Sequence, residues 1–243
     1  MKIETGFPFY GQEVGILVFS TVTPRVCGDA GNSRSFSYPV RYEVVKGGYA
    51  DLIEGSPQIK ANIVQACNNL TAFNIKAIVG DCGMMSLYQE DMGALAGVLF
   101  AGSSLCQIPM IWQLIGRSGK IGVITGHSRY LGTRHLRSSG WNDDIGLSVQ
   151  GMEDEPHFTE IVINGGLSLD VERMRNDVLS AGKKLRDKTP DLRAVIFECS
   201  NLATYSADLC SLLGVPVFDT LSAANMLSYA VNPPRYLYSE NQK

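Results

Sequence analysis

The ten-residue stretch Lys76-Ala-Ile-Val-Gly-Asp-Cys82-Gly-Met-Met85 recurs in the second half of the chain as Arg193-Ala-Val-Ile-Phe-Glu-Cys199-Ser-Asn-Leu202. In both copies a basic residue, an alanine and two β-branched residues come before an acid and a cysteine. The two cysteines are 117 residues apart, and Gly97-Val98 and Gly214-Val215 keep the same offset. The chain therefore reads as two copies of one unit. This predicts a site between two lobes, with one sulfur from each.

Short apolar runs alternate with helical patterns along the chain, which is typical of βαβ units and parallel sheets. We expect two lobes, residues 1–116 with 221–243 returning to them, and residues 117–220. The expected strands are 14–19, 40–45, 76–82, 98–101, 120–125, 146–150, 192–199 and 216–218. The expected helices are 57–70, 85–96, 105–115, 127–138, 170–186, 200–213 and one from 222.

The opening strands of the two halves, Val14-Gly-Ile-Leu17 and Ile121-Gly-Val-Ile124, match at an offset of 107, ten short of 117. We attribute the difference to ten extra residues in the first half, within the loop 21–39. This loop follows the carboxyl end of a strand, where open α/β sheets bind ligands. We expect it to cover the substrate. Arg25 and Arg34 are candidates to clamp an anionic group, with solvated surface arginines as the alternative.

Composition excludes several classes of function. The 243 residues are 45% hydrophobic and 19% charged, and the formal net charge of −3 shows no basic stripe, so we expect no nucleic-acid partner. No apolar run approaches the roughly 20 residues of a membrane-spanning helix, so we expect no membrane partner. The first ten residues lack the apolar core of a signal peptide, which predicts a cytoplasmic protein. The expected partner is a small-molecule substrate, and a homo-oligomer is left open.

The six cysteines are expected to be free thiols, because a chain of this size without a secretion signal rarely forms disulfides. No two are spaced C-x-x-C and only three histidines occur, so we expect no metal site. Cys67, Cys106 and Cys210 fall within helical apolar patterns and read as core residues. Cys27, in the loop 21–39, also reads as structural.

Cys82 and Cys199 are the candidate catalytic residues, since each ends a strand just before a helix. Backbone N–H groups and the helix dipole at such a position are expected to lower the pKa of the thiol. Two facing thiols place one sulfur on each side of a bound carbon, so that one can remove a proton while the other delivers one. This predicts stereoinversion by general acid–base catalysis with no cofactor.

With these two cysteine motifs the sequence resembles the aspartate/glutamate racemase superfamily, which includes hydantoin racemases, maleate isomerases and arylmalonate decarboxylases. The resemblance implies an α/β fold of two flavodoxin-like, three-layer lobes with parallel sheets, related by a pseudo-twofold axis. It places the active site in the cleft and makes Cys82 and Cys199 the acid–base pair. Where amino-acid racemases of this type carry Asn-Thr after the first cysteine, this chain has Gly83-Met84. Asn201 stands where glutamate racemases carry histidine.

Orienting groups for the substrate are expected at the strand ends and beside the thiols. The candidate substrate-binding residues are Thr21, Asn32, Gly83, Met84, Ser103, Thr125, Ser200, Asn201 and Thr220. Helix capping is the alternative explanation for each hydroxyl residue. Asp81 and Glu198 are expected to point to the opposite strand face from the cysteines and to be structural. His127 is expected to cap or line the start of its helix.

The interpretation that follows is an isomerase, namely a cofactor-independent racemase or epimerase. Its substrate would be a small carboxylate-bearing or cyclic amino-acid derivative, either an amino acid or a hydantoin. A maleate-type isomerase or a malonate decarboxylase of the same superfamily is one alternative, because the residues after the two cysteines differ. A non-catalytic, two-lobed protein that binds a small molecule is another, because α/β clefts also serve as receptors.

Overall fold

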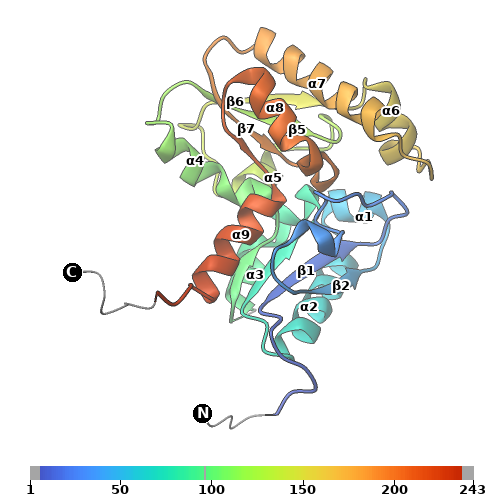
Figure 1. Ribbon diagram of the computed structural model, residues 1–243, viewed down its shortest axis with the longest axis vertical. Helices are drawn as coiled ribbons and strands as arrows, with labels where there is room; N and C mark the ends of the chain where they lie inside the picture. The colour runs from blue at the N-terminus through green and yellow to red at the C-terminus, as the bar shows by residue number, and fades with distance from the viewer. Residues whose placement is uncertain (1–5, 96, 237–243) are drawn as a thin grey trace.

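The computed structural model describes residues 6–95 and 97–236, which form two α/β lobes (Figure 1). The first lobe holds β1 (Val14–Phe19), β2 (Val40–Val45), β3 (Ala77–Gly80) and β4 (Leu99–Ala101), in the order β2-β1-β3-β4. The second holds β5 (Lys120–Thr125), β6 (Leu147–Gly151), β7 (Leu192–Phe197) and β8 (Val217–Phe218), in the order β6-β5-β7-β8. All neighbouring strands are parallel. The predicted fold class is confirmed.

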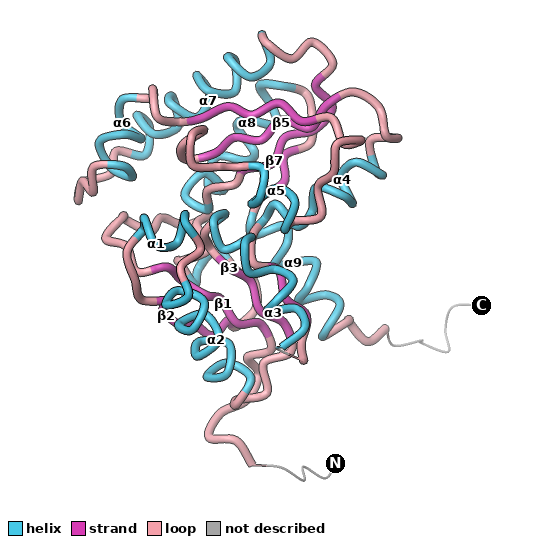
Figure 2. The backbone as a smooth tube through the Cα atoms, turned by 180° about the vertical axis from the view of Figure 1, so that it is seen from behind, coloured by secondary structure: helices cyan, strands magenta, loops and turns pink. Residues whose placement is uncertain are grey.

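Helices flank both sheets (Figure 2). Those in the first half are η1 (Ser33–Ser35), α1 (Tyr49–Glu54), α2 (Pro57–Thr71), η2 (Gly83–Tyr88), α3 (Gln89–Leu95), η3 (Ser104–Gln107) and α4 (Ile108–Leu114). Those in the second are α5 (Thr133–Ser138), α6 (Pro156–Phe158), the π-helical η4 (Thr159–Ile163), α7 (Val171–Asp187), η5 (Ser200–Tyr205), α8 (Ser206–Leu213) and α9 (Thr220–Val231). Among the described residues, no helix has the length and apolarity needed to cross a bilayer.

The two longest helices, α2 and α7, show how the sequence determines where a helix begins and which face it packs against its sheet. Ser56 caps α2 by accepting a hydrogen bond from the Ile59 N–H at 3.3 Å, and Pro57 opens the helix. Asp170 caps α7 in the same way, accepting from the N–H groups of Glu172 and Arg173 at 3.0 Å. Each helix then buries one apolar stripe against one face of its sheet. Other helices cover the opposite faces, so the strands of both sheets are largely buried.

The last helix, α9, follows the second sheet but packs on the first. Ala224 and Leu227 share one apolar cluster with β1 and β3. Asp219 caps α9 by accepting from the Ser222 N–H at 2.8 Å, and the Gln107 side chain donates to the Asp219 carbonyl at 2.9 Å. The chain thus crosses between the lobes at 219–220. Residues 237–243 of the expected return segment lie outside the described residues.

The ten-residue difference between the halves lies elsewhere than predicted. Val40 pairs with Val14 and Leu147 pairs with Ile121, so both second strands follow their first strands by 26 residues. The third strands differ: Ala77 follows Val40 by 37 residues, whereas Ala194 follows Leu147 by 47. The prediction of an insertion in the loop 21–39 was therefore wrong. The extra residues are in the second lobe, between β6 and β7, where α6 and η4 lie.

Three other expectations differ from the structure. Residues 127–132 form turns rather than the start of a helix, because the Tyr130 N–H bonds back to the His127 carbonyl at 3.1 Å and Gly132 caps α5. The helices expected from 85 and 105 begin as 3-10 turns, η2 and η3. The short helices α1, α6 and η4 carry too few residues for a periodic pattern, and the sequence did not predict them.

Matched glycines in β1 and β5 let the covering helices approach their sheets. A Cβ at Gly15 would lie 2.7 Å from Leu70 Cδ1 of α2, and one at Gly122 would lie 2.5 Å from Leu185 Cδ2 of α7. Both leucines are fully buried and cannot move aside freely. We expect Gly15→Ala and Gly122→Ala each to lower the free energy of unfolding by about 1–3 kcal/mol through overpacking, measured by urea denaturation.

Gly93→Ala is the matched control for this prediction. Gly93 lies on the exposed side of α3, where the atom nearest to an added Cβ is 4.0 Å away. Alanine should there raise stability by up to about 1 kcal/mol through helix propensity. Equal stability changes at all three glycines would contradict the packing argument.

Candidate active site

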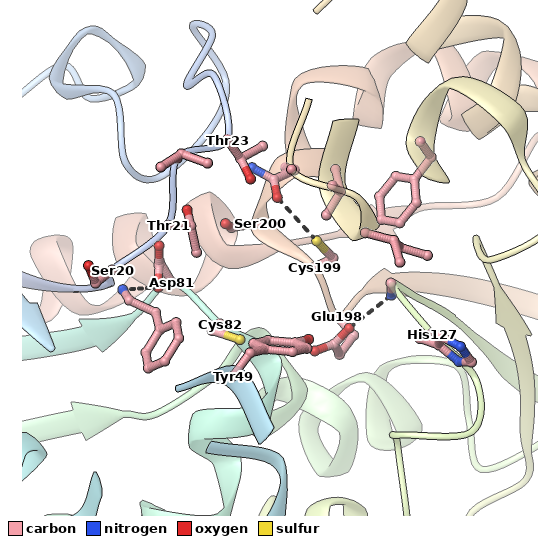
Figure 3. Close-up of a pocket in the computed structure, with 18 of the residues that line it drawn as sticks. Ser20, Thr21, Thr23, Tyr49, Asp81, Cys82, His127, Glu198, Cys199 and Ser200 are labelled. Carbon is pink, nitrogen blue, oxygen red and sulfur yellow. Dashed lines mark hydrogen bonds between the residues drawn. The ribbon is translucent and has the colours of Figure 1, made fainter. Parts of the chain in front are cut away.

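A pocket of about 520 Å³ lies between the lobes at the carboxyl ends of their strands (Figure 3). The first lobe contributes the segments that follow β1, β2 and β3. The second lobe contributes those that follow β5 and β7, together with α6 and η4. This is the position that open parallel sheets favour for ligands. A cavity of this size is typical of small-molecule sites.

Cys82 and Cys199 line this pocket from opposite sides. Each follows its strand and precedes a 3-10 turn, and the carbonyl of each accepts a hydrogen bond from the N–H three residues later, at 2.9 Å for Cys82 and 3.1 Å for Cys199. Both side chains are partly exposed to the cavity. The internal repeat therefore positions the two sulfurs equivalently.

The predicted lowering of the thiol pKa was wrong. Burial raises the pKa of both Cys82 and Cys199, and the negative charge of Glu198 raises both further. The backbone N–H groups of Met84 and Asn201 act in the predicted direction, but their effect is smaller. Both groups are therefore neutral thiols at neutral pH.

Glu198 is buried where the two lobes meet, with 3% of its surface exposed. Its carboxylate accepts hydrogen bonds from the Thr125 hydroxyl at 2.8 Å and the Gly126 N–H at 3.1 Å. Burial nevertheless raises its pKa. A Cβ on Gly83 of the first lobe would overlap this carboxylate. Glycine after Cys82 is thus explained, because the Glu198 side chain from the other lobe occupies that space.

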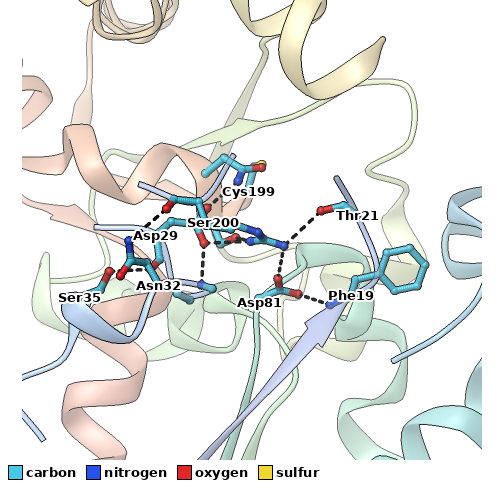
Figure 4. Close-up of polar contacts among 12 residues, drawn as sticks. Phe19, Thr21, Asp29, Asn32, Ser35, Asp81, Cys199 and Ser200 are labelled. Carbon is cyan, nitrogen blue, oxygen red and sulfur yellow. Dashed lines mark hydrogen bonds and ion pairs between the residues drawn. The ribbon is translucent and has the colours of Figure 1, made fainter. Parts of the chain in front are cut away.

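A buried ion-pair network lies beside the first cysteine (Figure 4). Arg25 donates to Asp81 at 2.8 Å and to Asp29 at 2.9 Å, and both carboxylates are almost fully buried. Asp81 also accepts from the Phe19 N–H at 2.9 Å. Burial raises the pKa of Asp81 to about 6, against the opposing charge of Arg25.

The same network fastens the loop after β1 to the second lobe. The Asn201 side chain donates to Asp29 at 2.5 Å, and the Thr204 hydroxyl donates to the Cys27 carbonyl at 3.1 Å. Gly28, with a φ of +105°, lies so close to Thr204 that a Cβ would clash with it. The loop thus crosses the cleft, and its residues Thr21, Val22, Thr23 and Arg25 line the pocket. Arg34 does not line it.

Five of the predicted site residues line the pocket: Cys82, Cys199, Thr21, Ser200 and Asn201. The other six do not line it: Asn32, Gly83, Met84, Ser103, Thr125 and Thr220. Asn32 and Ser103 instead cap η1 and η3, and Thr125 supports Glu198. Met84 and Thr220 are buried. Helix capping was the alternative explanation for the hydroxyl residues, and it accounts for Ser103.

Sequence reasoning missed several pocket residues. Asp81 and Glu198 were assigned to a structural face by strand alternation, but the pocket spans the ends of the sheets, where side chains from both faces meet. Tyr49 follows β2, and the Gly47-Gly48 pair before it could have marked that strand end. Phe158, Val162 and Ile163 lie between β6 and β7, in the half of the chain to which the sequence comparison did not assign the ten extra residues.

His127 lines the pocket next to an aromatic neighbour. Its ring lies 4.2 Å from the ring of Tyr130, centroid to centroid, and its Nδ1 accepts from the Arg129 N–H at 3.3 Å. A ring nitrogen that accepts leaves the other nitrogen to carry the proton. The histidine therefore contributes a flat ring and one donor to the wall of the cavity.

Removing Arg25 should destabilise the fold because two buried carboxylates would lose their cation. We expect Arg25→Met to lower the free energy of unfolding by about 3–5 kcal/mol at neutral pH. The loss should shrink as the pH falls toward about 6, since removal of Arg25 raises the pKa of Asp81 further, and the folded variant then takes up a proton at a pH where Asp81 of the parental protein is still ionised. Urea denaturation at pH 5 and 8 measures this, with exposed Arg34→Met as the control. An equal loss at both pH values would contradict the assignment.

No protein-family model matches the chain. The chain is 28% identical over 219 residues to a dimethylsulfoniopropionate lyase of Durusdinium sp. clade D, covering 86% of this chain and 72% of that protein. It is 27% identical over 238 residues to dimethylsulfoniopropionate lyase 3 of Emiliania huxleyi (strain CCMP1516), covering 92% and 61%. The chain thus spans about 60 to 70% of the length of these relatives.

These relatives correct the predicted activity. The sequence motifs suggested an isomerase that racemises an amino acid or hydantoin, with a maleate-type isomerase, a malonate decarboxylase or a binding protein as alternatives. The curated relatives are named lyases, so the racemase prediction is contradicted and the isomerase class is not supported. Two facing thiols permit proton transfer, but they do not decide which bond breaks next.

Solved structures agree with the topology. Arylmalonate decarboxylase matches with a TM-score of 0.59 at 14% identity, covering 91% of this chain and 95% of that one. Allantoin racemase from Klebsiella pneumoniae matches with a TM-score of 0.54 at 15% identity, covering 94% and 98%. Aspartate racemase of Picrophilus torridus matches with a TM-score of 0.56 at 13% identity, covering 90% and 94%. The chain therefore has the fold of the aspartate/glutamate racemase superfamily, as the cysteine motifs suggested.

Proposed function

We propose that this protein is a lyase that eliminates a sulfide from dimethylsulfoniopropionate or a closely related sulfonium carboxylate. The observation that carries the proposal is the similarity, over 86% to 92% of the chain, to proteins named for that activity. The pocket supports it, because two thiols flank a cavity large enough for a small zwitterion. The same pocket holds buried carboxylates that suit a cationic group.

The elimination needs one base. The base takes a proton from the carbon next to the carboxylate, and the electron pair of that C–H bond forms the new double bond. The bond between the next carbon and sulfur breaks, and its pair stays on sulfur. The sulfonium leaves as neutral dimethyl sulfide, acrylate remains, and the base later releases its proton to water.

We assign the base to Cys199. Its pKa is raised by burial, by Glu198 and by Asp29, but the Asn201 N–H and the positive charge of Arg25 oppose that rise. At Cys82 the Met84 N–H opposes the rise, but Arg25 is not among the groups that do, and the charge of Asp81 adds to that of Glu198. The thiolate therefore forms more readily at Cys199. Cys82 completes the opposite wall and is not required to exchange a proton.

Unequal effects of the two cysteines test this assignment. Cys199→Ser should lower kcat/KM for dimethylsulfoniopropionate by at least about a hundredfold, because a serine hydroxyl is a far weaker base at the same position. Cys82→Ser should lower it by a smaller factor. Proton NMR of the acrylate vinyl signals and headspace measurement of dimethyl sulfide give the rates.

Cys210→Ser is the control, since Cys210 is exposed on α8 and does not line the pocket. It should leave the rate unchanged. Acrylate formation at the parental rate by Cys199→Ser would exclude Cys199 as the base. Failure of the parental protein to form acrylate would exclude the proposed function.

The pH profile follows from the raised thiol pKa. Only the thiolate of Cys199 acts as a base, and burial and Glu198 hold its pKa above that of an ordinary cysteine. We expect kcat/KM to climb about tenfold per pH unit through neutrality and to keep rising above pH 9. Glu198→Gln should move this rise to lower pH. A plateau already reached at pH 7 in the parental protein would contradict the assignment.

A further inference from the structure

The two ends of the pocket differ in chemistry. In Figure 3, Thr21, Thr23 and Ser200 lie toward one end, while Tyr49 and Glu198 lie toward the other, with the thiols between them. A symmetric pair of lobes therefore encloses an asymmetric cavity. An elongated substrate with unlike ends would bind in one orientation only.

The Tyr49–Glu198 end combines aromatic rings with a buried carboxylate. Figure 3 shows the Tyr49 ring between Cys82 and Glu198, with its hydroxyl end toward the carboxylate. Phe158 also lines the pocket, and a Cβ at Gly126, whose N–H donates to Glu198, would lie 3.5 Å from Phe158 Cζ. Aromatic faces bind cations whose charge is spread over methyl groups.

Glu198 has no cationic partner within the part of the chain that the structure describes. Its hydrogen bonds come from a hydroxyl and a backbone N–H, and both donors are neutral. Asp81, by contrast, is paired with Arg25. Among the described residues, Glu198 is thus a pocket-lining carboxylate without an ion pair, and it lies at the aromatic end. A buried carboxylate of this kind is stabilised when a cation binds next to it.

The opposite end offers hydroxyl donors beside one arginine, which Asp29 and Asp81 already engage. Thr21, Thr23 and Ser200 line it, and Arg25 donates to the Ser200 hydroxyl at 3.4 Å. Hydroxyl groups can donate hydrogen bonds to a carboxylate. The Glu198 end therefore suits the cationic group of a zwitterion, and the hydroxyl end can receive its carboxylate.

We propose that Tyr49, Phe158 and Glu198 form an onium subsite that binds the sulfonium group, while the hydroxyl groups of Thr21, Thr23 and Ser200 receive the substrate carboxylate. This inference rests on the proposed function for the identity of the onium group. In this orientation the carbon to be deprotonated, which lies between the two charged ends, is next to the thiols. The leaving sulfide departs against aromatic rings rather than against charged donors.

Binding of unreactive probes tests the subsite separately from catalysis. The probes are 3-(trimethylammonio)propanoate and 4,4-dimethylpentanoate, which have the same shape and carboxylate but differ in the charge of the head group. Calorimetric titration of the parental protein should give at least about tenfold tighter binding of the ammonium probe. Equal affinity for the two probes would overturn the proposal.

Four substitutions, one of them a control, locate the preference for the ammonium probe. Glu198→Gln should remove most of it by weakening binding of the ammonium probe alone, whereas Glu90→Gln, on the exposed side of α3, should preserve it. Tyr49→Phe should keep the preference, because the ring remains, and Tyr49→Leu should reduce it about fivefold. An unchanged preference in Glu198→Gln, or equal losses in the two Tyr49 variants, would count against the subsite.

The outcomes separate the subsite from the proposed function. A tenfold preference for the ammonium probe without acrylate formation would support an onium site and reject the lyase. Acrylate formation without any preference would support the lyase and reject the subsite. If a thermal melt shows that Glu198→Gln does not fold, the parental comparison and the Tyr49 pair decide the question.

Discussion

The burial of the Glu198 carboxylate between the lobes is the constraint on which the pocket depends. The carboxylate is held by the Thr125 hydroxyl and the Gly126 N–H of its own lobe, and it fills the space that any side chain at position 83 would need in the other. It lies beside both thiols and raises the pKa of each. A buried charge without a cation is costly, and such groups usually mark sites where function requires them.

The loop after β1 solves a second electrostatic problem. Asp81, beside the first cysteine, and Asp29, within the loop, are both buried, and Arg25 neutralises part of their charge. Asp29 also accepts from Asn201 in the second lobe, so the same ionic network closes the loop over the cleft. One arginine thus fixes the loop, the strand end and the lobe contact together. With Arg25 committed to these carboxylates, the charge of Glu198 remains uncompensated.

The sequence predicts the architecture well because the fold depends on features that repeat. The cysteine strands and the cleft between the lobes follow from the motif at 76–85 and its copy at 193–202. What it missed depends on contacts between distant segments. No local pattern shows that Glu198 fills the space over Gly83, or that Arg25 reaches Asp81. The insertion at α6 and η4 was assigned to the wrong half, although the strand register places it clearly.

Burial aside, the raised pKa of the thiols and the negative charge of the onium subsite share one source, the Glu198 carboxylate. Burial and Glu198 keep both cysteines protonated at neutral pH, which makes them less reactive. A sulfonium bound against Glu198 would cancel the charge that raises the pKa of Cys199. The substrate would then lower the pKa of the base that attacks it. A carboxylate without a cationic head would leave the thiol protonated. Specificity for an onium substrate would therefore operate through ionisation of the base as well as through binding.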